Sequence, residues 1–475
     1  MSGPQASAKL RMAHLTLLTG LAVLALASPA MGQVFAAPNT CTVPGSAPDL
    51  LPRDRESRND LLRTTAFDAT VYGLSAYLQY EQLYRQVADK ASSNWTGFFR
   101  FSHERDLAGP DYATFKVPNS DTLYSTAWID LRSGPVEIEI PPTHLRYFTL
   151  NVFDIFGNPD NLSNRTIGFR GGRFLVVPPG WSGSAPPGVK VWPAGSAQLW
   201  VLMRAFAQSA RDVKVARAFQ DQVRIIPPAD APEADPAMPK PEAGAAGFLR
   251  SLDYILRANG CRPGEEALVS RFRPLGVLAA RSFALSQIDP ADLPAIELGY
   301  RAALDAITRS KSQLGVPTST GWVKVDKGNY GFNYLRRSVT NAAGLGANVR
   351  EENASYTAFV DGSGKTLDGA KTRYRLHLPS PPPVDAFWSV TLYDAKTFAL
   401  YPNSLKRYLV SDRTSGLKVG KDGSIDILVQ NAPRRDANWL PAPKGPFFIV
   451  LRAYSPRPPM LAGEWQPPAV EAIEP

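Results

Sequence analysis

Asp121 and Tyr124 are the two side chains of this sequence best placed to do chemistry. They belong to the stretch Val-Pro-Asn-Ser-Asp-Thr-Leu-Tyr-Ser at residues 117–125, where Asn119 and Asp121 flank a serine. Short polar side chains after a proline commonly close a turn, so a structural role explains Asn119 and Asp121. The functional alternative is that Asp121 and Tyr124 project into a pocket. A carboxylate beside a phenol could there orient a hydroxyl or carbonyl group, or serve as an acid–base pair.

A second polar pair lies in the stretch Arg-Tyr-Phe-Thr-Leu-Asn-Val-Phe-Asp, residues 146–154. An ion pair between neighbouring strands would account for Arg146 and Asp154 on structural grounds alone. The functional alternative is a clamp for a substrate carboxylate, because a guanidinium binds a carboxylate through two parallel hydrogen bonds.

Aromatic residues in the C-terminal third form a third group of candidates. Trp388 and Tyr393 lie in Phe-Trp-Ser-Val-Thr-Leu-Tyr-Asp at 387–394, and Trp439 follows Asn438. Packing in a core explains them. Aromatic side chains with a polar tip also line small-molecule cavities, which are mostly apolar and often lie between domains.

Several other chemistries are excluded by the motifs. The chain has no Gly-x-Ser-x-Gly elbow, and His103, His144 and His377 are too widely spaced for a metal centre. The Gly-Ser-Gly-Lys-Thr run at 362–366 has Phe359 where a phosphate loop needs glycine, so a hairpin turn is predicted. Two Asp-Gly-Ser turns lack the spacing of a calcium or magnesium site. We therefore predict no metal and no cofactor.

Hydrophobic periodicity predicts the elements that must position these residues. Spacings of three and four indicate a helix over 59–90, in which Gly73 could introduce a bend. Alternation then indicates short strands separated by Gly- and Pro-rich turns, and a helix over 213–223 closes this module. The predicted strands are 135–140, 147–153, 173–177, 189–192 and 199–205.

A Pro-rich segment, 227–244, separates this module from the rest and is predicted to be a stiff, exposed linker. Residues 245–320 are predicted to be mainly helical, with Asp289 as an N-cap and Pro290 at the first helical position. A second β module covers 321–475. Its predicted strands are 356–360, 374–378, 388–393, 425–429 and 447–451.

The fold class that follows is mainly β with a helical segment. Two β-sandwich or jelly-roll-like modules, 58–226 and 321–475, are joined through the Pro-rich linker and the helical region. A chain of 475 residues is long enough for two or three domains.

The N-terminus predicts export. Residues 1–32 combine a basic start, an uncharged apolar run of about a dozen residues and Ala-Met-Gly, as in a signal peptide. Residues 33–57 are predicted to be a flexible leader, and no later stretch is long enough to span a bilayer. The mature protein is then soluble and periplasmic or secreted. In that compartment Cys41 and Cys261 either form a disulfide or stay reduced, because their separation in sequence decides nothing about proximity.

The net charge of +9 comes from basic residues that are scattered rather than gathered in a stripe. Nucleic-acid binding requires a concentrated basic footprint, so it is not expected.

The motifs at 117–125 and 146–154 resemble those of the domain of unknown function 1254. Those at 387–394 and 438–447, with the Gly-x-Asn-Tyr-Leu-x-Arg pattern at 331–337, resemble the domain of unknown function 1214. The resemblance covers nearly all of the mature chain and implies two β-sandwich or jelly-roll domains. Ser75 and Ser455 depart from the common pattern, so a cavity that they line would differ in shape here.

Two classes of function follow. In the first, the β modules enclose a cavity for a small, largely apolar organic molecule. Asp121, Tyr124 and Arg146 are its polar contacts, Trp388 and Trp439 are its walls, and Asn119, Asp154 and Tyr393 are further binding candidates. In the second, the protein is a structural or envelope-associated homo-oligomer that covers its edge strands. Whether the protein is an enzyme stays open.

Overall fold

A computed structural model describes residue 41 and residues 50–112, 117–207 and 209–473. The predicted signal peptide lies outside these residues, and so do residues 33–40 and 42–49 of the predicted leader; the leader's last three residues, 55–57, belong to α1 (Arg55–Leu83). Within the described residues, no helix combines the length and apolar character needed to cross a membrane.

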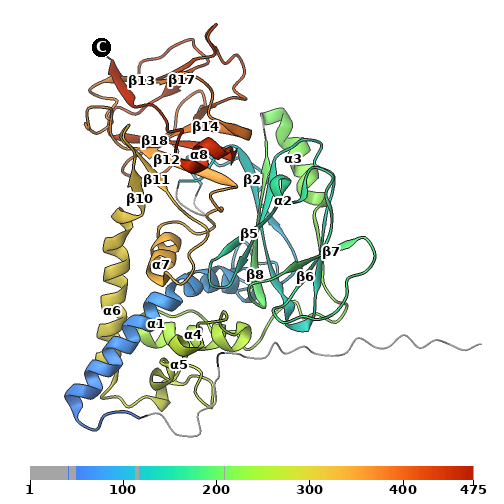
Figure 1. Ribbon diagram of the computed structural model, residues 1–475, viewed down its shortest axis with the longest axis vertical. Helices are drawn as coiled ribbons and strands as arrows, with labels where there is room; N and C mark the ends of the chain where they lie inside the picture. Colours follow the sequence, from blue (N-terminus) through green and yellow to red (C-terminus); the bar gives the residue numbers. More distant parts are fainter. Residues whose placement is uncertain (1–40, 42–49, 113–116, 208, 474–475) are drawn as a thin grey trace, which may run out of the picture. The chain divides into compact units, whose positions relative to one another are not determined.

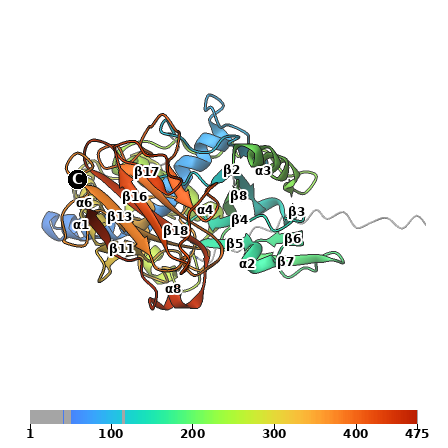
Figure 2. The same cartoon turned by 90° about the horizontal axis from the view of Figure 1, so that it is seen from above.

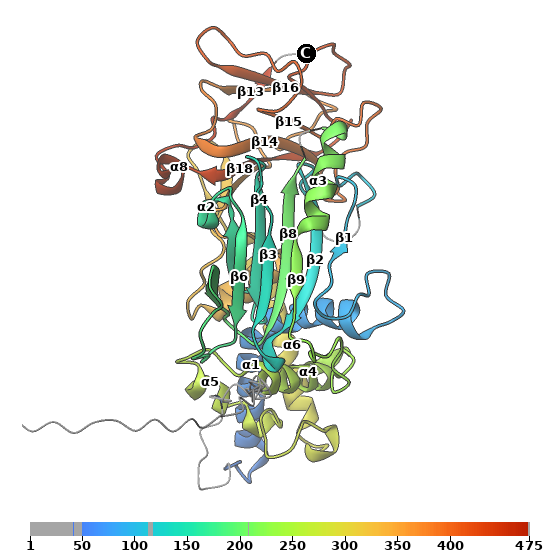
Figure 3. The same cartoon turned by 90° about the vertical axis from the view of Figure 1, so that its right-hand side faces the viewer.

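The N-terminal module contains two sheets (Figure 3). The five-stranded sheet has the order β1 (Ser102–His103), β2 (Thr122–Asp130), β8 (Gln198–Phe206), β4 (Phe148–Asp154), β5 (Pro159–Ser163). The second has the order β7 (Val189–Pro193), β6 (Gly172–Val177), β3 (Val136–Ile140), β9 (Arg224–Ile226). In β3 the apolar residues are buried and the two glutamates lie closer to the surface, as the alternation predicted. Helix α3 (Ala210–Gln222) packs beside β2 and β8.

The C-terminal module also has two sheets, with a hydrophobic core shared between them. The first has the order β10 (Gly315–Pro317), β11 (Trp322–Val325), β12 (Asn353–Ala358), β18 (Phe447–Pro456), β14 (Val384–Asp394), β15 (Leu409–Ser411). The second has the order β17 (Trp439–Pro441), β16 (Ile425–Gln430), β13 (Arg373–Leu378), β19 (Val470–Ile473). Viewed from above, β13, β16 and β17 lie over β18 (Figure 2). Helix α8 (Pro458–Ala462) follows β18.

The helices form a separate group beside the sheets (Figure 1). They are α1 (Arg55–Leu83), α4 (Gly244–Asn259), α5 (Glu266–Ser270), α6 (Leu293–Ser310) and α7 (Tyr334–Ala343). Helix α1 runs through Gly73 without a break. A Cβ atom at Gly73 would lie 2.8 Å from Leu252 Cδ1, so this glycine permits close packing of α1 against α4. The β-rich fold class is confirmed. Helices α1, α3 and α4 to α6 overlap the helical stretches predicted at 59–90, 213–223 and 245–320, and α7 lies within the predicted second β module.

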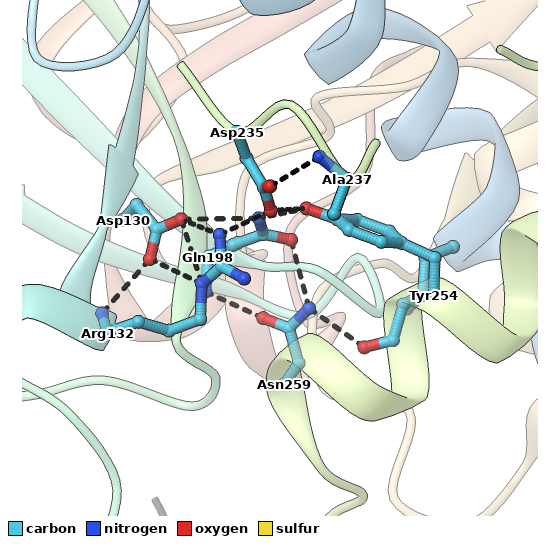
Figure 4. A network of polar contacts seen from close by, with 8 residues as sticks. Asp130, Arg132, Gln198, Asp235, Ala237, Tyr254 and Asn259 are labelled. Atoms are coloured by element: carbon cyan, nitrogen blue, oxygen red, sulfur yellow. Dashed lines mark hydrogen bonds and ion pairs between the residues drawn. The ribbon is translucent and has the colours of Figure 1, made fainter. Parts of the chain in front are cut away.

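The Pro-rich segment is largely exposed, as its composition predicts, and it is also hydrogen-bonded to the rest of the protein. Asp235 accepts hydrogen bonds from Arg132 and Tyr254, each at 2.7 Å, in a network that joins the N-terminal module to α4 (Figure 4). Tyr80 on α1 donates to the carbonyl of Pro239 at 2.6 Å. Hydrogen bonds with three separate elements therefore hold this segment against the protein.

The expected start of α6 was also wrong. The helix begins at Leu293, and the Asp289 carboxylate instead accepts from the Ala291 amide at 2.9 Å to close the preceding turn. Asp292 is paired with Arg58 on α1 at 2.6 Å. Asp292, the residue just before α6, is therefore engaged in an ion pair with α1.

Candidate functional site

The two faces of strand β14 have different surroundings. Trp388, Val390 and Leu392 point into the core of the C-terminal module. Ser389 and Tyr393, on the opposite face, contact the loop before β2. The ends of β2, β4 and β8 meet this polar face of β14 and β18 (Figure 3). We call the polar residues at this junction the polar layer; all but the half-buried Lys327 are buried. It contains Asn119, Asp121, Tyr124, Arg204, Lys327, Tyr393, Arg452 and Tyr454.

Asn119 and Asp121 connect the two modules. The Asn119 side-chain oxygen accepts from the amides of Asp121 and Thr122 at 3.2 and 3.1 Å, so it does close a turn. Its amide nitrogen donates to the Tyr454 hydroxyl at 2.9 Å. Ser389 Oγ donates to Asp121 Oδ2 at 2.8 Å. Asn119 and Asp121 therefore combine the structural role with a place in the polar layer.

Burial raises the pKa of Asp121 to about 6, against the opposing effects of the Ser389 hydrogen bond and the Arg452 charge. A carboxyl group with a pKa in this range can exchange a proton near neutral pH. Burial also raises the pKa of Tyr124, so its phenol is neutral and able to donate.

Arg452 holds the C-terminal wall of the layer. It donates through Nη1 to the Tyr393 hydroxyl at 2.8 Å and through Nη2 to the carbonyl of Val117 at 2.9 Å. The Tyr393 hydroxyl in turn donates to the carbonyl of Pro118. Arg452 and Tyr393 together fix the loop that carries Asp121.

Arg204 holds the N-terminal wall. It donates to the side-chain oxygen of Asn151 and to the carbonyl of Gly346, both at 2.6 Å. Its guanidinium carbon lies 5.5 Å from the centre of the Tyr124 ring. All of these groups are neutral, so the charge of Arg204 has no anionic partner here.

Lys327 adds a third cation. Its Nζ donates to Asn353 Oδ1 at 3.0 Å and to Ser355 Oγ at 3.3 Å. Burial, together with the charges of Arg452 and Arg204, lowers the pKa of Lys327 to about 7. Among the described residues, Arg204, Lys327 and Arg452 form no salt bridge, so the layer carries a surplus of positive charge.

Glu352 provides a further buried link between the modules. It accepts from Tyr147 at 2.8 Å, from Ser163 at 2.7 Å and from Arg165 at 3.2 Å. Burial raises its pKa, and the Ser163 and Tyr147 hydrogen bonds oppose this. Because Arg165 already pairs with it, Glu352 does not compensate the three cations of the layer.

An open cleft of about 1020 Å³ lies next to the polar layer, between the modules. Its aromatic residues Tyr147, Phe206 and Phe387 pack on one another, with ring centres 4.3 Å apart for Phe206–Phe387 and 5.4 Å for Tyr147–Phe387. Tyr454 stacks on Phe387 at 4.1 Å and reaches Asn119 with its hydroxyl. The aromatic floor of the cleft is therefore in contact with the polar layer.

Three non-glycine residues that line this cleft have left-handed backbone conformations. The φ angles are +48° at His144, +68° at Leu145 and +50° at Ser455. Such conformations are unfavourable for side chains with a Cβ, and they concentrate at ligand sites. Ser455, one of the two departures from the family pattern, thus shapes this cleft.

Four of the candidates predicted from sequence lie outside the polar layer. Arg146 pairs with Asp212 on α3 at 2.6 Å, not with Asp154, so the expected ion pair was wrong. Asp154 accepts from Asn158 and closes a turn. Trp388 is in the core of the C-terminal module, and Trp439 donates to the Gln430 carbonyl at 2.9 Å. Of these four, only Arg146 lines the cleft.

Sequence reasoning missed Arg204, Lys327, Arg452 and Tyr454. Arg204 and Arg452 carried a signal, because each is a single charged residue in or beside a strand predicted to be apolar. Lys327 follows β11 in a stretch without periodicity and gave none. Within the described residues, no cluster of three or more His, Cys, Asp or Glu side chains could hold a metal ion. Cys41 and Cys261 form a disulfide with Cα atoms 5.5 Å apart.

These features define a two-module β protein with a charged polar layer between its modules. Residues 98–227 match the family described as Protein of unknown function (DUF1254), and residues 352–458 match Protein of unknown function (DUF1214). The chain therefore contains these two domains in this order, as its motifs predicted.

Among solved structures, the VPA0106 protein from Vibrio parahaemolyticus is similar to this chain, with a TM-score of 0.68 and 22% identity over 87% of this chain and 100% of that one. This similarity shows the fold. An uncharacterized protein from Burkholderia cenocepacia aligns with a TM-score of 0.41 and 14% identity over 89% of this chain and 90% of that one. No curated protein matches the chain.

Proposed function

We propose that the protein binds a small organic acid at the junction of its two β modules. The observation that carries the proposal is the group of three basic side chains, Arg204, Lys327 and Arg452, without a salt bridge among the described residues; Lys327, whose pKa is about 7, is about half charged at neutral pH. The two arginines are only 7% and 8% exposed. Buried charges are costly unless they are paired, so an anionic group bound here would gain more than it would at the surface.

The charge balance favours an acid over a neutral ligand. The Arg452 charge lowers the pKa of the Asp121 carboxylate, and Glu352 is already paired with Arg165. With one anion against three cations, the layer accommodates a further negative charge. Guanidinium groups suit carboxylates because their N–H donors match the two oxygens.

The body of the ligand is proposed to be largely apolar and to lie on the aromatic floor of the cleft. Tyr147, Phe206 and Phe387 supply this surface in place of the expected Trp388 and Trp439. Clefts with aromatic walls and a few convergent polar groups are typical small-molecule sites. Asp121 and Tyr124 remain candidates for proton transfer to such a ligand.

The proposed location is the periplasm or the extracellular space. The signal-like residues 1–32 support it, and so does the Cys41–Cys261 disulfide, since structural disulfides persist mainly in oxidising compartments.

The test compares hexanoate with hexan-1-ol, which share an alkyl chain and differ in charge. Isothermal titration calorimetry is expected to show binding of hexanoate and much weaker binding of the alcohol. Arg204→Met should weaken hexanoate binding. Arg301→Met, at an exposed site on α6, is the matched control and should change nothing.

Equal affinity for the acid and the alcohol would contradict the proposal. So would hexanoate binding that is the same in Arg204→Met and the wild type. Native mass spectrometry of the purified protein, before and after denaturation, provides a second readout. A retained acid lost on denaturation would identify the ligand directly, and the same spectrum counts the chains in each assembly.

A further inference from the structure

Lys327 differs from an ordinary surface lysine in its partners. Its ammonium nitrogen contacts two neutral oxygens, Asn353 Oδ1 and Ser355 Oγ, at 3.0 and 3.3 Å. No carboxylate forms a salt bridge with it in the described part of the chain. The two acceptors are neutral, so they stabilise the ammonium less than a carboxylate would.

The register of the sheet places Lys327 beside Arg452. Ser355 on β12 is the direct cross-strand partner of Arg452 on β18, and Arg452 is the partner of Ser389 on β14. Directly opposed residues of antiparallel strands project from the same face of a sheet. Lys327, bound to Ser355, therefore lies at the edge of the row that continues through Arg452 to Ser389 and Asp121.

Lys327 is less buried than the two arginines of the polar layer. Its side chain is half-buried, whereas Arg204 and Arg452 around it are almost fully buried. With a pKa lowered to about 7, about half of the Lys327 side chains are free amines at neutral pH. A desolvated amine next to other cations is the arrangement that turns lysine into a nucleophile.

We propose that Lys327 attacks the carbonyl carbon of an oxo acid whose carboxylate is held by Arg204 and Arg452, and forms an imine with it. This inference rests on the proposed function, because the arginines must bind the acid group before the amine can reach the carbonyl. It narrows the substrate class from organic acids to acids that carry a ketone or aldehyde near the carboxylate.

The step balances without any further reactant. The Nζ lone pair of the free amine forms the C–N bond while the C=O π bond breaks, and one proton moves from nitrogen to the new alkoxide to give a carbinolamine. The hydroxyl then leaves as water with one added proton. The nitrogen lone pair forms the C=N bond, and the resulting iminium can release its proton. Asp121 on the facing loop or Tyr124 on β2 could exchange these protons.

The experiment traps the imine by reduction. The protein is incubated with 2-oxohexanoate, hexanoate or hexanal in the presence of cyanoborohydride, which converts the imine into a stable secondary amine. Peptide mass spectrometry then locates the adduct. Alkylation of Lys327 blocks tryptic cleavage after it, and a modified peptide covering 325–336 is expected.

We expect the adduct on Lys327 to form roughly tenfold faster with 2-oxohexanoate than with hexanal, because the carboxylate is held by the arginines. Hexanoate should give none and should compete with the oxo acid. Lys327→Gln should abolish this adduct. Lys324→Gln is the matched control: Lys324 is three residues earlier and donates to the Met460 carbonyl, so its loss should leave the adduct intact.

The wild-type protein alone decides the question, whatever the variants do to folding. If hexanoate binds and 2-oxohexanoate gives no adduct on Lys327, the nucleophile is refuted while the proposed acid site stands. Adducts spread evenly over the surface lysines would also refute Lys327 as the nucleophile. If neither acid binds and no adduct forms, the acid site fails and the inference fails with it.

Discussion

Arg204 and Arg452 occupy corresponding places in the two modules and differ in what neutralises them. Each lies on an interior strand of its sheet and is almost fully buried. Arg204 is held by amide oxygens of Asn151 and Gly346. Arg452 is held by a phenol and a carbonyl, and Asp121 across the junction is near enough for the Arg452 charge to lower its pKa. The C-terminal wall thus has a local counter-charge, whereas the N-terminal wall has none.

The largest effect, on the free energy of unfolding, is expected when the Asp121 carboxylate is removed. Burial raises the pKa of Asp121 from 3.8 to about 6 in the folded protein. Between these two pH values the folded state binds more protons than the unfolded state, so the free energy of unfolding falls as pH rises through this window. The total loss is about 3 kcal/mol at pH 7.

Asp121→Asn should therefore raise the free energy of unfolding by up to about 3 kcal/mol at pH 7 and leave it nearly unchanged near pH 4. Urea unfolding at the two pH values measures this difference. Asp305→Asn, on the exposed side of α6, is the control and should show no such pH-dependent gain. A destabilised Asp121→Asn protein at pH 7 would mean that Arg452 depends on the carboxylate more than its other contacts suggest.

The second effect is a loss of hexanoate affinity, which should differ between replacement of Arg204 and replacement of Arg452. Arg204→Met removes a full positive charge, so hexanoate affinity should fall roughly 100-fold, as for a lost hydrogen bond to a charged group. Arg452→Met should cost only roughly tenfold, because Asp121 then takes up a proton and keeps the local charge nearly constant. Calorimetric Kd values at pH 7 test this order. A larger loss for Arg452→Met would reverse the comparison.

The smallest effect concerns the support of Arg452. Tyr393→Phe removes the acceptor for Arg452 and the donor to the Pro118 carbonyl, so the free energy of unfolding should fall by about 1–2 kcal/mol. Tyr84→Phe serves as the control, since the Tyr84 hydroxyl makes no hydrogen bond within the described residues. Thermal unfolding compares the two variants. Equal melting temperatures would show that the Val117 carbonyl alone suffices to hold Arg452.

Sequence periodicity predicted the elements better than the site. The strands around 147–153 and 388–393 appear where the alternation placed them. Alternation cannot say which face meets another module when both faces are buried. Trp388 and Tyr393 therefore seemed equivalent, although one lies in a core and the other in the polar layer.

The partners of charged residues were beyond sequence reasoning for a related reason. Arg146 and Asp154 lie at the two ends of one motif, yet Arg146 pairs with Asp212, which comes from a helix 66 residues further along. The motif at 117–125 was correctly singled out, because short polar residues beside a buried strand are unusual. Its contacts with Ser389 and Tyr454, however, depend on how the two modules meet.

The disulfide between Cys41 and Cys261 gives the chain a topology that its ribbon does not reveal. The two cysteines are 220 residues apart, so they close a covalent ring that contains both sheets of the N-terminal module. A protease cut anywhere within the ring leaves one covalent molecule until the bond is reduced. In the chain-entropy description such a ring restricts the unfolded chain by about 5 kcal/mol. The rest of the chain follows the ring as an open tail, and its folding is tied to that of the ring by the contacts at the junction and by those of α6 and α7 with α1.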